Sequence, residues 1–224
     1  RTVSQELSRR RDARALRYSF FAGRSAARLA MADALSSEIA RVGVVGAGRL
    51  GVTLADLFSR AGFEVLLVER DRQAINAASG LLRHPAIRTS TTLSGLLECD
   101  FVIEAATEDY DAKASIFIGL DELLPGDRII ATTTSGVDID ALAAVTRRAS
   151  RVCGMHVIPF AQAPSVVEVV RTSDSSPDTL ATAVGLARHI GLLPVVVGNA
   201  FGFIGPVLLG TAKAACLQVT PAGP

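Results

Sequence analysis

Short apolar runs alternate with amphipathic segments along most of the chain. From Arg41 onward the β-rich runs RVGVVG, EVLLVE and DFVIEAA are each followed by a segment whose apolar positions recur at helical spacing. The runs RIIATTT, RVCGMHV, VVEVV and LPVVVG continue the pattern, with helices predicted at 138–146 and near 178–189. Strands that alternate with helices predict βαβ units, so the sequence indicates an α/β fold with a doubly wound, mostly parallel sheet.

Helical patterns flank this region on both sides. Residues 5–32 predict one helix, and a helical pattern resumes at about Ile204. We therefore expect three parts: a helical linker or appendage over 1–40, an α/β domain over 41–200, and the start of a C-terminal helical domain over 201–224.

Composition narrows the class of protein. The chain is 49% hydrophobic and 20% charged with a net charge of +1, which gives no electrostatic reason to expect a nucleic acid or an anionic membrane as partner. No apolar run approaches the roughly 20 residues of a membrane span. Cys99, Cys153 and Cys216 are far apart, and the three histidines lack metal-ligand spacing. We expect reduced thiols, no metal and a cytoplasmic location.

Positive charge is concentrated near the N-terminus. Residues 1–41 hold nine arginines against four acidic residues. This composition is also typical of a transit peptide, but Asp12, Asp33 and Glu38 are unusual in one. A linker is therefore the favoured interpretation of this segment.

A glycine motif follows the first predicted strand. GAGRLG places Gly46, Gly48 and Gly51 in a G-x-G-x-x-G pattern between a strand and a helix, which is the context that dinucleotide binding requires. The first glycine makes the tight turn, the second lets a pyrophosphate approach, and the third lets the helix pack closely. Unpaired N–H groups at the helix start, including those near Arg49 and Leu50, are expected to bind the phosphates. The alternative is a tight turn that binds no nucleotide.

An acidic residue ends the second predicted strand. Glu69 lies eighteen residues after Gly51, where a carboxylate can accept hydrogen bonds from the adenine ribose. It would also repel a 2′-phosphate, which favours NAD over NADP, although the adjacent Arg70 weakens this preference.

Further polar residues are predicted at the same edge of the sheet. Glu104 and Glu108 lie near the carboxyl end of a strand, where open α/β sheets bind ligands, and Lys113 follows within two helical turns. Lys113 is either a ligand of cofactor or substrate oxygen, or a solvated lysine on a helix face. The hydroxyls of Thr134 and Ser135 are expected to point into the cleft, although such clusters also occur in turns.

His156 and Glu168 complete the set of candidates. An imidazole can take a hydroxyl proton as hydride leaves the neighbouring carbon, and a carboxylate can orient the ring and stabilise the imidazolium. The alternative is an ordinary histidine at the end of a strand. Spacing alone does not separate the two interpretations.

Taken together, these motifs resemble the NAD-dependent L-3-hydroxyacyl-CoA dehydrogenases. GAGRLG, VIEAATED, ATTTSG, GMHVIPF, VVEVV and PVVVGNAFGFIG occur in the family's order over roughly residues 41–210. The upstream ALRYSFFAGRSAARLA looks like the linker that follows the enoyl-CoA hydratase domain in multifunctional β-oxidation enzymes. VVVGNAFGFIG is most similar to the peroxisomal bifunctional type, so the resemblance also allows a peroxisomal location.

The resemblance implies a Rossmann-type domain that transfers hydride between C3 of an L-3-hydroxyacyl-CoA and NAD. It implies that Ser135 binds the substrate hydroxyl or carbonyl, that His156 is the general base, and that Glu168 holds His156. The residues that it assigns to NAD are Glu69, for the adenosine ribose, and Glu108 and Lys113, for the nicotinamide half.

The sequence also departs from the family. Pro206 stands where the family has an asparagine, and proline offers neither an N–H nor an amide side chain. Only a short segment separates Asp71 from Leu93, where the family has a longer helical hairpin that helps to hold coenzyme A. Two alternatives follow: an NAD-binding sensor or scaffold that has lost catalysis, and a dehydrogenase of a smaller 3-hydroxy acid without coenzyme A.

Overall fold

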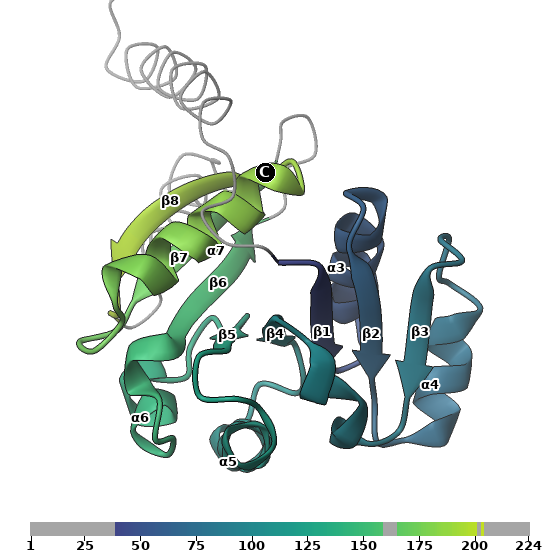
Figure 1. The fold of residues 1–224 in the computed structure, drawn as a ribbon, viewed down its shortest axis with the longest axis horizontal. Helices are drawn as coiled ribbons and strands as arrows, with labels where there is room; N and C mark the ends of the chain where they lie inside the picture. The colour runs from purple at the N-terminus through teal and green to yellow at the C-terminus, as the bar shows by residue number, and fades with distance from the viewer. Residues whose placement is uncertain (1–38, 159–164, 201–202, 204–224) are drawn as a thin grey trace, which may run out of the picture. The chain divides into compact units, whose positions relative to one another are not determined.

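The described residues of the computed structural model form one eight-stranded sheet flanked by helices (Figure 1). The structure describes residues 39–158, 165–200 and 203, which all belong to one compact unit, Leu35–Pro224. The strands are β1 (Arg41–Val45), β2 (Glu64–Val68), β3 (Ile87–Ser90), β4 (Phe101–Glu104), β5 (Ile129–Thr132), β6 (Val152–Ile158), β7 (Val166–Arg171) and β8 (Leu193–Gly198). The helices are α3 (Arg49–Arg60), α4 (Arg72–Ser79), η1 (Leu93–Glu98), α5 (Tyr110–Leu123), α6 (Ile139–Ala144), η2 (Ala149–Arg151) and α7 (Pro177–His189).

The sheet is mostly parallel, as predicted. Its strand order is β3-β2-β1-β4-β5-β6-β7-β8, and every pair from β3 to β6 is parallel. The pair β6 and β7 is antiparallel, and β8 returns parallel to β7. The chain reverses strand order between β1 and β4, which is the position where doubly wound sheets bind ligands.

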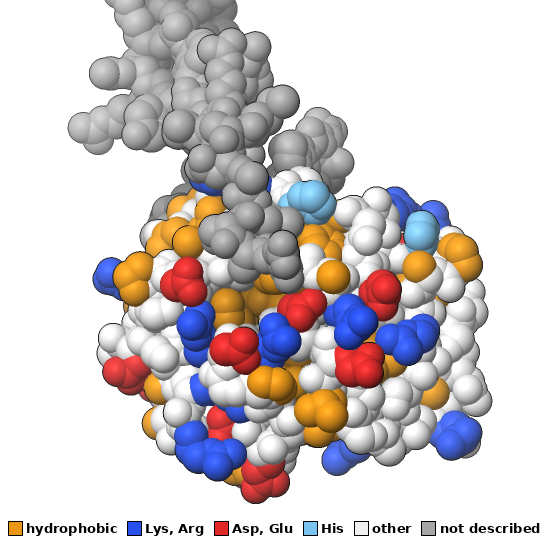
Figure 2. Space-filling view, viewed as in Figure 1, with side chains coloured by type: hydrophobic (Ala, Val, Ile, Leu, Met, Phe, Trp, Pro, Cys, Tyr) orange, Lys and Arg blue, Asp and Glu red, His pale blue; other side chains and the backbone are white. Residues whose placement is uncertain are grey.

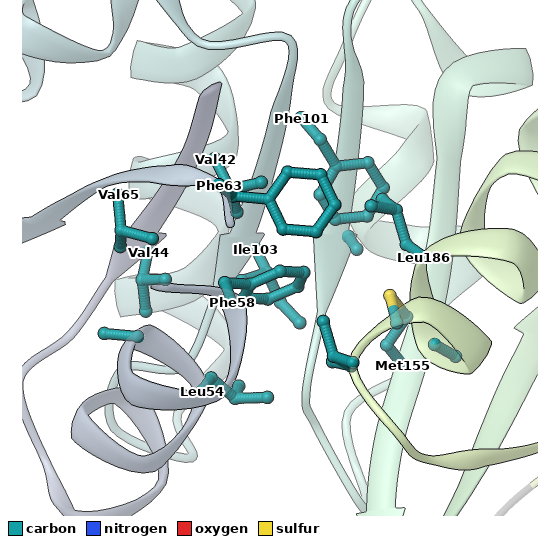
Figure 3. Close-up of a cluster of buried hydrophobic side chains, with 14 of the residues drawn as sticks. Val42, Val44, Leu54, Phe58, Phe63, Val65, Phe101, Ile103, Met155 and Leu186 are labelled. Atoms are coloured by element: carbon teal, nitrogen blue, oxygen red, sulfur yellow. The ribbon is translucent and has the colours of Figure 1, made fainter. Parts of the chain in front are cut away.

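Helices cover both faces of the sheet. Apolar residues of α3, α4 and α7 pack with β1, β2, β4 and β6 in one core, where Phe58, Phe101, Met155 and Leu186 meet (Figure 3). Apolar residues of η1, α5 and α6 pack against the other face. Because both faces are covered, the central strands β4 and β5 are buried along their whole length, which explains why each begins with three apolar residues in a row.

The sequence prediction missed one strand. β3 reads IRTS, with a single apolar residue, and lies at the edge of the sheet with no residue fully buried. An edge strand of this kind carries no hydrophobic period, so pairing with β2 alone identifies it. The helices predicted over 5–32 and from Ile204, the proline at position 206, and the parts expected over 1–40 and 201–224 lie almost wholly outside the described residues. Among the residues described, no helix combines the length and apolar character needed to cross a bilayer.

Candidate functional site: a dinucleotide cleft

The carboxyl ends of the parallel strands open onto a cavity of about 1180 Å³. Its walls come from the loops after β1, β2, β4 and β5 and from the end of β6. Three of the predicted site residues, Gly51, Lys113 and Glu168, are buried and do not line the cavity. The predicted residues that line it are Gly46, Gly48, Arg49, Leu50, Glu69, Glu108, Ser135 and His156.

The glycine loop joins β1 to α3 with almost no space around two of its glycines. Gly46 has a φ of 103°, and a Cβ there would lie 2.6 Å from the carbonyl oxygen of Ala105. A Cβ on Gly51 would lie 1.9 Å from the carbonyl oxygen of Gly46. A Cβ on Gly48 would meet nothing within 4 Å. The open space at Gly48, at the start of α3, is where a pyrophosphate can approach the backbone N–H groups.

Glu69 faces the glycine loop from the end of β2. Its Oε2 accepts a hydrogen bond of 3.2 Å from the Ala47 N–H, and its Oε1 accepts one of 3.1 Å from the Asp71 N–H. These contacts fix the carboxylate in the cavity wall beside the loop. A carboxylate in this position fits the ribose hydroxyls of NAD, while the exposed Arg70 also lines the cavity.

The imidazole of His156 is paired with a buried carboxylate. His156 and Glu168 lie directly opposite each other in the antiparallel β6–β7 pair, and His156 Nδ1 lies 2.9 Å from Glu168 Oε2. Glu168 is 2% exposed, whereas His156 borders the cavity. A carboxylate on Nδ1 orients the ring, so the pair has the geometry expected of a general base and the carboxylate that holds it.

A phenylalanine that the sequence did not single out lies against the same imidazole. The ring of Phe203 has its centroid 5.6 Å from that of His156, at an interplanar angle of 49°. Phe203 is buried and has a φ of 47°, a rare conformation for a residue with a side chain. The only signal in the sequence was its place in the motif VVVGNAFGFIG.

The loop after β5 is tied to Glu108. Glu108 Oε1 accepts hydrogen bonds from Thr134 Oγ1 at 2.6 Å, from the Ser135 N–H at 2.8 Å and from the Gly136 N–H at 3.0 Å. Partial burial pushes the pKa of Glu108 upward, but these hydrogen bonds and the charge of Lys113 outweigh it and hold the pKa below its usual range. Ser135 is exposed in the cavity, as predicted. The expectation for Thr134 is wrong, since the residue is 1% exposed and its hydroxyl donates a hydrogen bond to Glu108.

Lys113 is buried beneath the cavity. It lies in the first turn of α5, which begins where Asp109 Oδ1 accepts a hydrogen bond from the Ala112 N–H. Lys113 is 0% exposed, and its Nζ lies 2.8 Å from Oε1 of Glu104, which is also 0% exposed. The interpretation of Lys113 as a solvated lysine is therefore wrong. In the part of the chain that is described, no cluster of side chains could hold a metal ion.

Comparison with known proteins identifies the family. A family model described as "3-hydroxyacyl-CoA dehydrogenase, NAD binding domain" matches residues 41–86 and 83–200, which is more than half of the chain. The chain belongs to the 3-hydroxyacyl-CoA dehydrogenase family. The two matched segments overlap at residues 83–86, between α4 and β3.

Relatives of this dehydrogenase family have both long and short chains. The chain is 32% identical to the peroxisomal bifunctional enzyme of Cavia porcellus over 223 residues, which cover 88% of this chain and 31% of that enzyme. It is 32% identical to a probable 3-hydroxybutyryl-CoA dehydrogenase of Bacillus subtilis over 187 residues, 75% of this chain and 65% of that protein. The chain thus spans about a third of the length of the bifunctional relatives.

A solved structure of a dehydrogenase in this family has the same fold. The crystal structure of (S)-3-hydroxybutyryl-CoA dehydrogenase from Ralstonia eutropha matches with a TM-score of 0.75 and 31% identity, covering 81% of this chain and 72% of that one. The Rossmann-type fold and NAD as the cofactor are therefore established for residues 41–200.

On the face shown in Figure 2, acidic and basic side chains are interspersed and do not gather by sign.

Proposed function

We propose that this chain carries the dehydrogenase site of an enzyme that transfers hydride between C3 of an L-3-hydroxyacyl-CoA and NAD in fatty-acid β-oxidation. The observation that supports this most strongly is the 2.9 Å contact between His156 Nδ1 and Glu168 Oε2 beside the cavity that the glycine loop also lines. A proton acceptor and a dinucleotide loop at one cavity are the two parts that alcohol oxidation requires.

Each residue at the cavity has a defined part in this proposal. NAD supplies the acceptor for the hydride that leaves C3. His156 removes the proton of the C3 hydroxyl as the carbonyl forms, and Glu168 stabilises the resulting imidazolium. Ser135 Oγ, exposed in the cavity, holds the substrate oxygen by a hydrogen bond. Glu69 would hold the adenosine ribose of NAD, and Glu108, at the cavity wall, would hold the nicotinamide half.

The test is NADH oxidation that depends on acetoacetyl-CoA, measured after NADH binding is established by fluorescence. We expect His156→Gln and Glu168→Gln each to lower turnover by about 100-fold or more and to leave NADH affinity within about threefold. His189→Gln is the matched control, because His189 bonds to the Ala61 carbonyl and does not line the cavity. Equal turnover in the original chain and His156→Gln would contradict the proposal, and NADH binding without turnover in either would favour the sensor or scaffold.

One observation favours a second candidate substrate. The connection from α4 to β3 is only residues 80–86, in the region where the family's hairpin helps to hold coenzyme A. A dehydrogenase of a small, free 3-hydroxy acid would not need this hairpin. Competition between acetoacetate and acetoacetyl-CoA separates the two substrates. A dehydrogenase of the small free acid would consume acetoacetate at low concentration and would not consume acetoacetyl-CoA.

We extend the proposal to the domain arrangement and the setting of the chain. The bifunctional relatives support a fused enoyl-CoA hydratase domain upstream, joined through the linker over 1–40, with a helical domain starting in 201–224. The same relatives support a peroxisomal location as an alternative to a cytoplasmic one. A direct test is to express the chain with and without an added hydratase domain and compare the turnover of enoyl-CoA and hydroxyacyl-CoA.

A further inference from the structure

An asparagine side chain lies between two carboxylates near the site. Asn199 directly follows β8, and its amide nitrogen lies 2.7 Å from Asp138 Oδ1 and 2.9 Å from Asp140 Oδ2. An amide nitrogen has two protons to donate, so this one group donates to both carboxylates. Two like charges this close repel each other unless a donor lies between them. The Asn199 amide therefore holds together two groups that would otherwise move apart.

Both carboxylates belong to the start of α6. Asp138 Oδ1 also accepts a hydrogen bond of 3.0 Å from the Asp140 N–H, which makes Asp138 the N-terminal cap of the helix. Asp140 Oδ1 accepts hydrogen bonds from the Ser173 N–H at 2.7 Å and from the Ser173 hydroxyl at 3.1 Å. Three segments that are far apart in the sequence thus meet at Asn199: the start of α6, the segment after β7 and the end of β8.

The start of α6 directly follows the loop of residues 133–136, which carries Ser135. Glu108 holds this loop through the Ser135 N–H, at 2.8 Å. Asp138 lies two residues beyond the loop, so its contact with Asn199 fixes the chain at the point where the loop ends. The place of Ser135 at the cavity therefore depends on a contact at each side of the loop.

The backbone of Asn199 leads to His156. The Asn199 N–H donates to the Arg171 carbonyl oxygen at 3.1 Å, which extends the pairing of β7 with β8 by one residue. Phe203 lies four residues after Asn199, and its ring packs against His156. The Phe203 N–H donates to the Ala200 carbonyl oxygen at 2.9 Å, so Phe203 is tied back to the residue next to Asn199. Fixing Asn199 therefore fixes the start of the segment that places the Phe203 ring.

We propose that Asn199 is a positioning residue that keeps Ser135 and the His156 ring in a fixed arrangement at the cavity. It acts on Ser135 through the start of α6 and on His156 through Phe203. Asn199 does not line the cavity, so we assign it no contact with substrate or cofactor. The inference rests on the proposed function, because that function gives Ser135 and His156 their places at the reacting centre. The competing outcome is a local role, in which Asn199 only stabilises the start of α6.

The experiment moves the amide group from one side of the contact to the other, in the full chain. Asn199→Asp removes the donor and places a third carboxylate beside Asp138 and Asp140. Asn199→Asp/Asp140→Asn restores a donor, because an amide at position 140 can accept from Ser173 with its oxygen and donate towards position 199 with its nitrogen. The double variant thus has the same net charge as the original chain and again links the end of β8 to α6.

The readouts are amide hydrogen exchange and the signals of the His156 ring, both followed by NMR. We expect Asn199→Asp to make exchange at the Ser135 N–H about tenfold faster or more and to shift the His156 ring signals. Asn199→Asp/Asp140→Asn is expected to return the exchange rate to within about threefold of the original and the ring signals towards their original positions. Asn76→Asp is the matched control, because it makes the same change on an exposed residue of α4.

A local role gives a different result. Faster exchange confined to the N–H groups of Asp140 and Ser173, with Ser135 and His156 unchanged, would overturn the proposal. If Asn199→Asp does not fold, Asn199→Ala removes the donor without adding a charge at this half-buried position. It must accelerate exchange at Ser135 by about fivefold or more, and unchanged exchange there overturns the proposal. None of these measurements needs turnover, so failure of the proposed function and failure of the positioning role remain distinguishable.

Discussion

At the scale of single residues, His156 is fixed by contacts of two kinds. Glu168 binds one ring nitrogen at 2.9 Å, and the buried ring of Phe203 lies against the imidazole at 5.6 Å. The hydrogen bond sets which nitrogen is engaged. The aromatic contact restricts the space in which the imidazole ring can rotate. In the proposed reaction, a base held in this way would present a constant geometry to the substrate hydroxyl.

This arrangement predicts an effect of Phe203→Leu that does not depend on the cofactor loop. We expect the NMR signals of the His156 ring protons to shift as the aromatic ring is lost, and turnover of acetoacetyl-CoA to fall about tenfold because the base is less well oriented. NADH affinity is expected to be unchanged. Phe203→Tyr keeps the ring and serves as the control, and identical His156 signals in the leucine variant would show that the two rings do not interact in solution.

At the scale of elements, two glycines of the β1–α3 turn are expected to have different roles: Gly51 in folding and Gly48 in binding. Gly51→Ala places a methyl group 1.9 Å from the Gly46 carbonyl oxygen, so we expect it to lower the free energy of unfolding by about 3 kcal/mol. Gly48→Ala meets no atom within 4 Å and is expected to leave stability within about 0.5 kcal/mol. Its methyl group enters the cavity, however, so NADH binding should weaken about tenfold. Urea unfolding and NADH titration check both variants, and equal NADH affinity in Gly48→Ala and the original chain would contradict the pyrophosphate site.

The elements also show what the sequence could and could not predict. The central strands were predictable because burial on both faces gives each of them three consecutive apolar residues. The glycine loop was predictable because the spacing of the glycines in GAGRLG is the spacing that the turn between β1 and α3 requires. β3 was not predictable, since IRTS at a sheet edge has no hydrophobic period. The burial of Lys113 was equally hidden, because a lysine on a helix becomes buried only when a carboxylate neutralises it, and the sequence does not show that Glu104, at the end of the preceding strand, lies within contact distance.

At the scale of the whole molecule, several carboxylates are held in their ionised form by the fold. Burial raises the pKa of Asp121, but hydrogen bonds from Arg147 and Arg148 outweigh it and hold the pKa below its usual range. Asp140 is similar: burial acts upward, while hydrogen bonds from Asn199 and the loop at Ser173 lower the pKa. The pKa of Glu108 is also lowered, as described above. Each of these groups binds protons more weakly in the folded chain than in the unfolded one.

Two buried cysteines have raised pKa values, so they affect stability at alkaline pH instead of acid pH. Burial raises the pKa of Cys99 to about 11 and that of Cys153 to about 12, from an ordinary value of 9.0, so the folded chain retains protons that the unfolded chain loses. The contribution of the two thiols to stability is therefore complete below pH 9 and is lost as the pH rises towards their pKa values in the folded chain. The contribution of the carboxylates is complete above about pH 4 and is lost below it. Urea unfolding across a series of pH values should thus give the highest free energy of unfolding between about pH 5 and pH 8. Cys99→Ala/Cys153→Ala should flatten the alkaline fall and leave the acid fall in place, and an alkaline slope equal to that of the original chain would show that these thiols do not govern it.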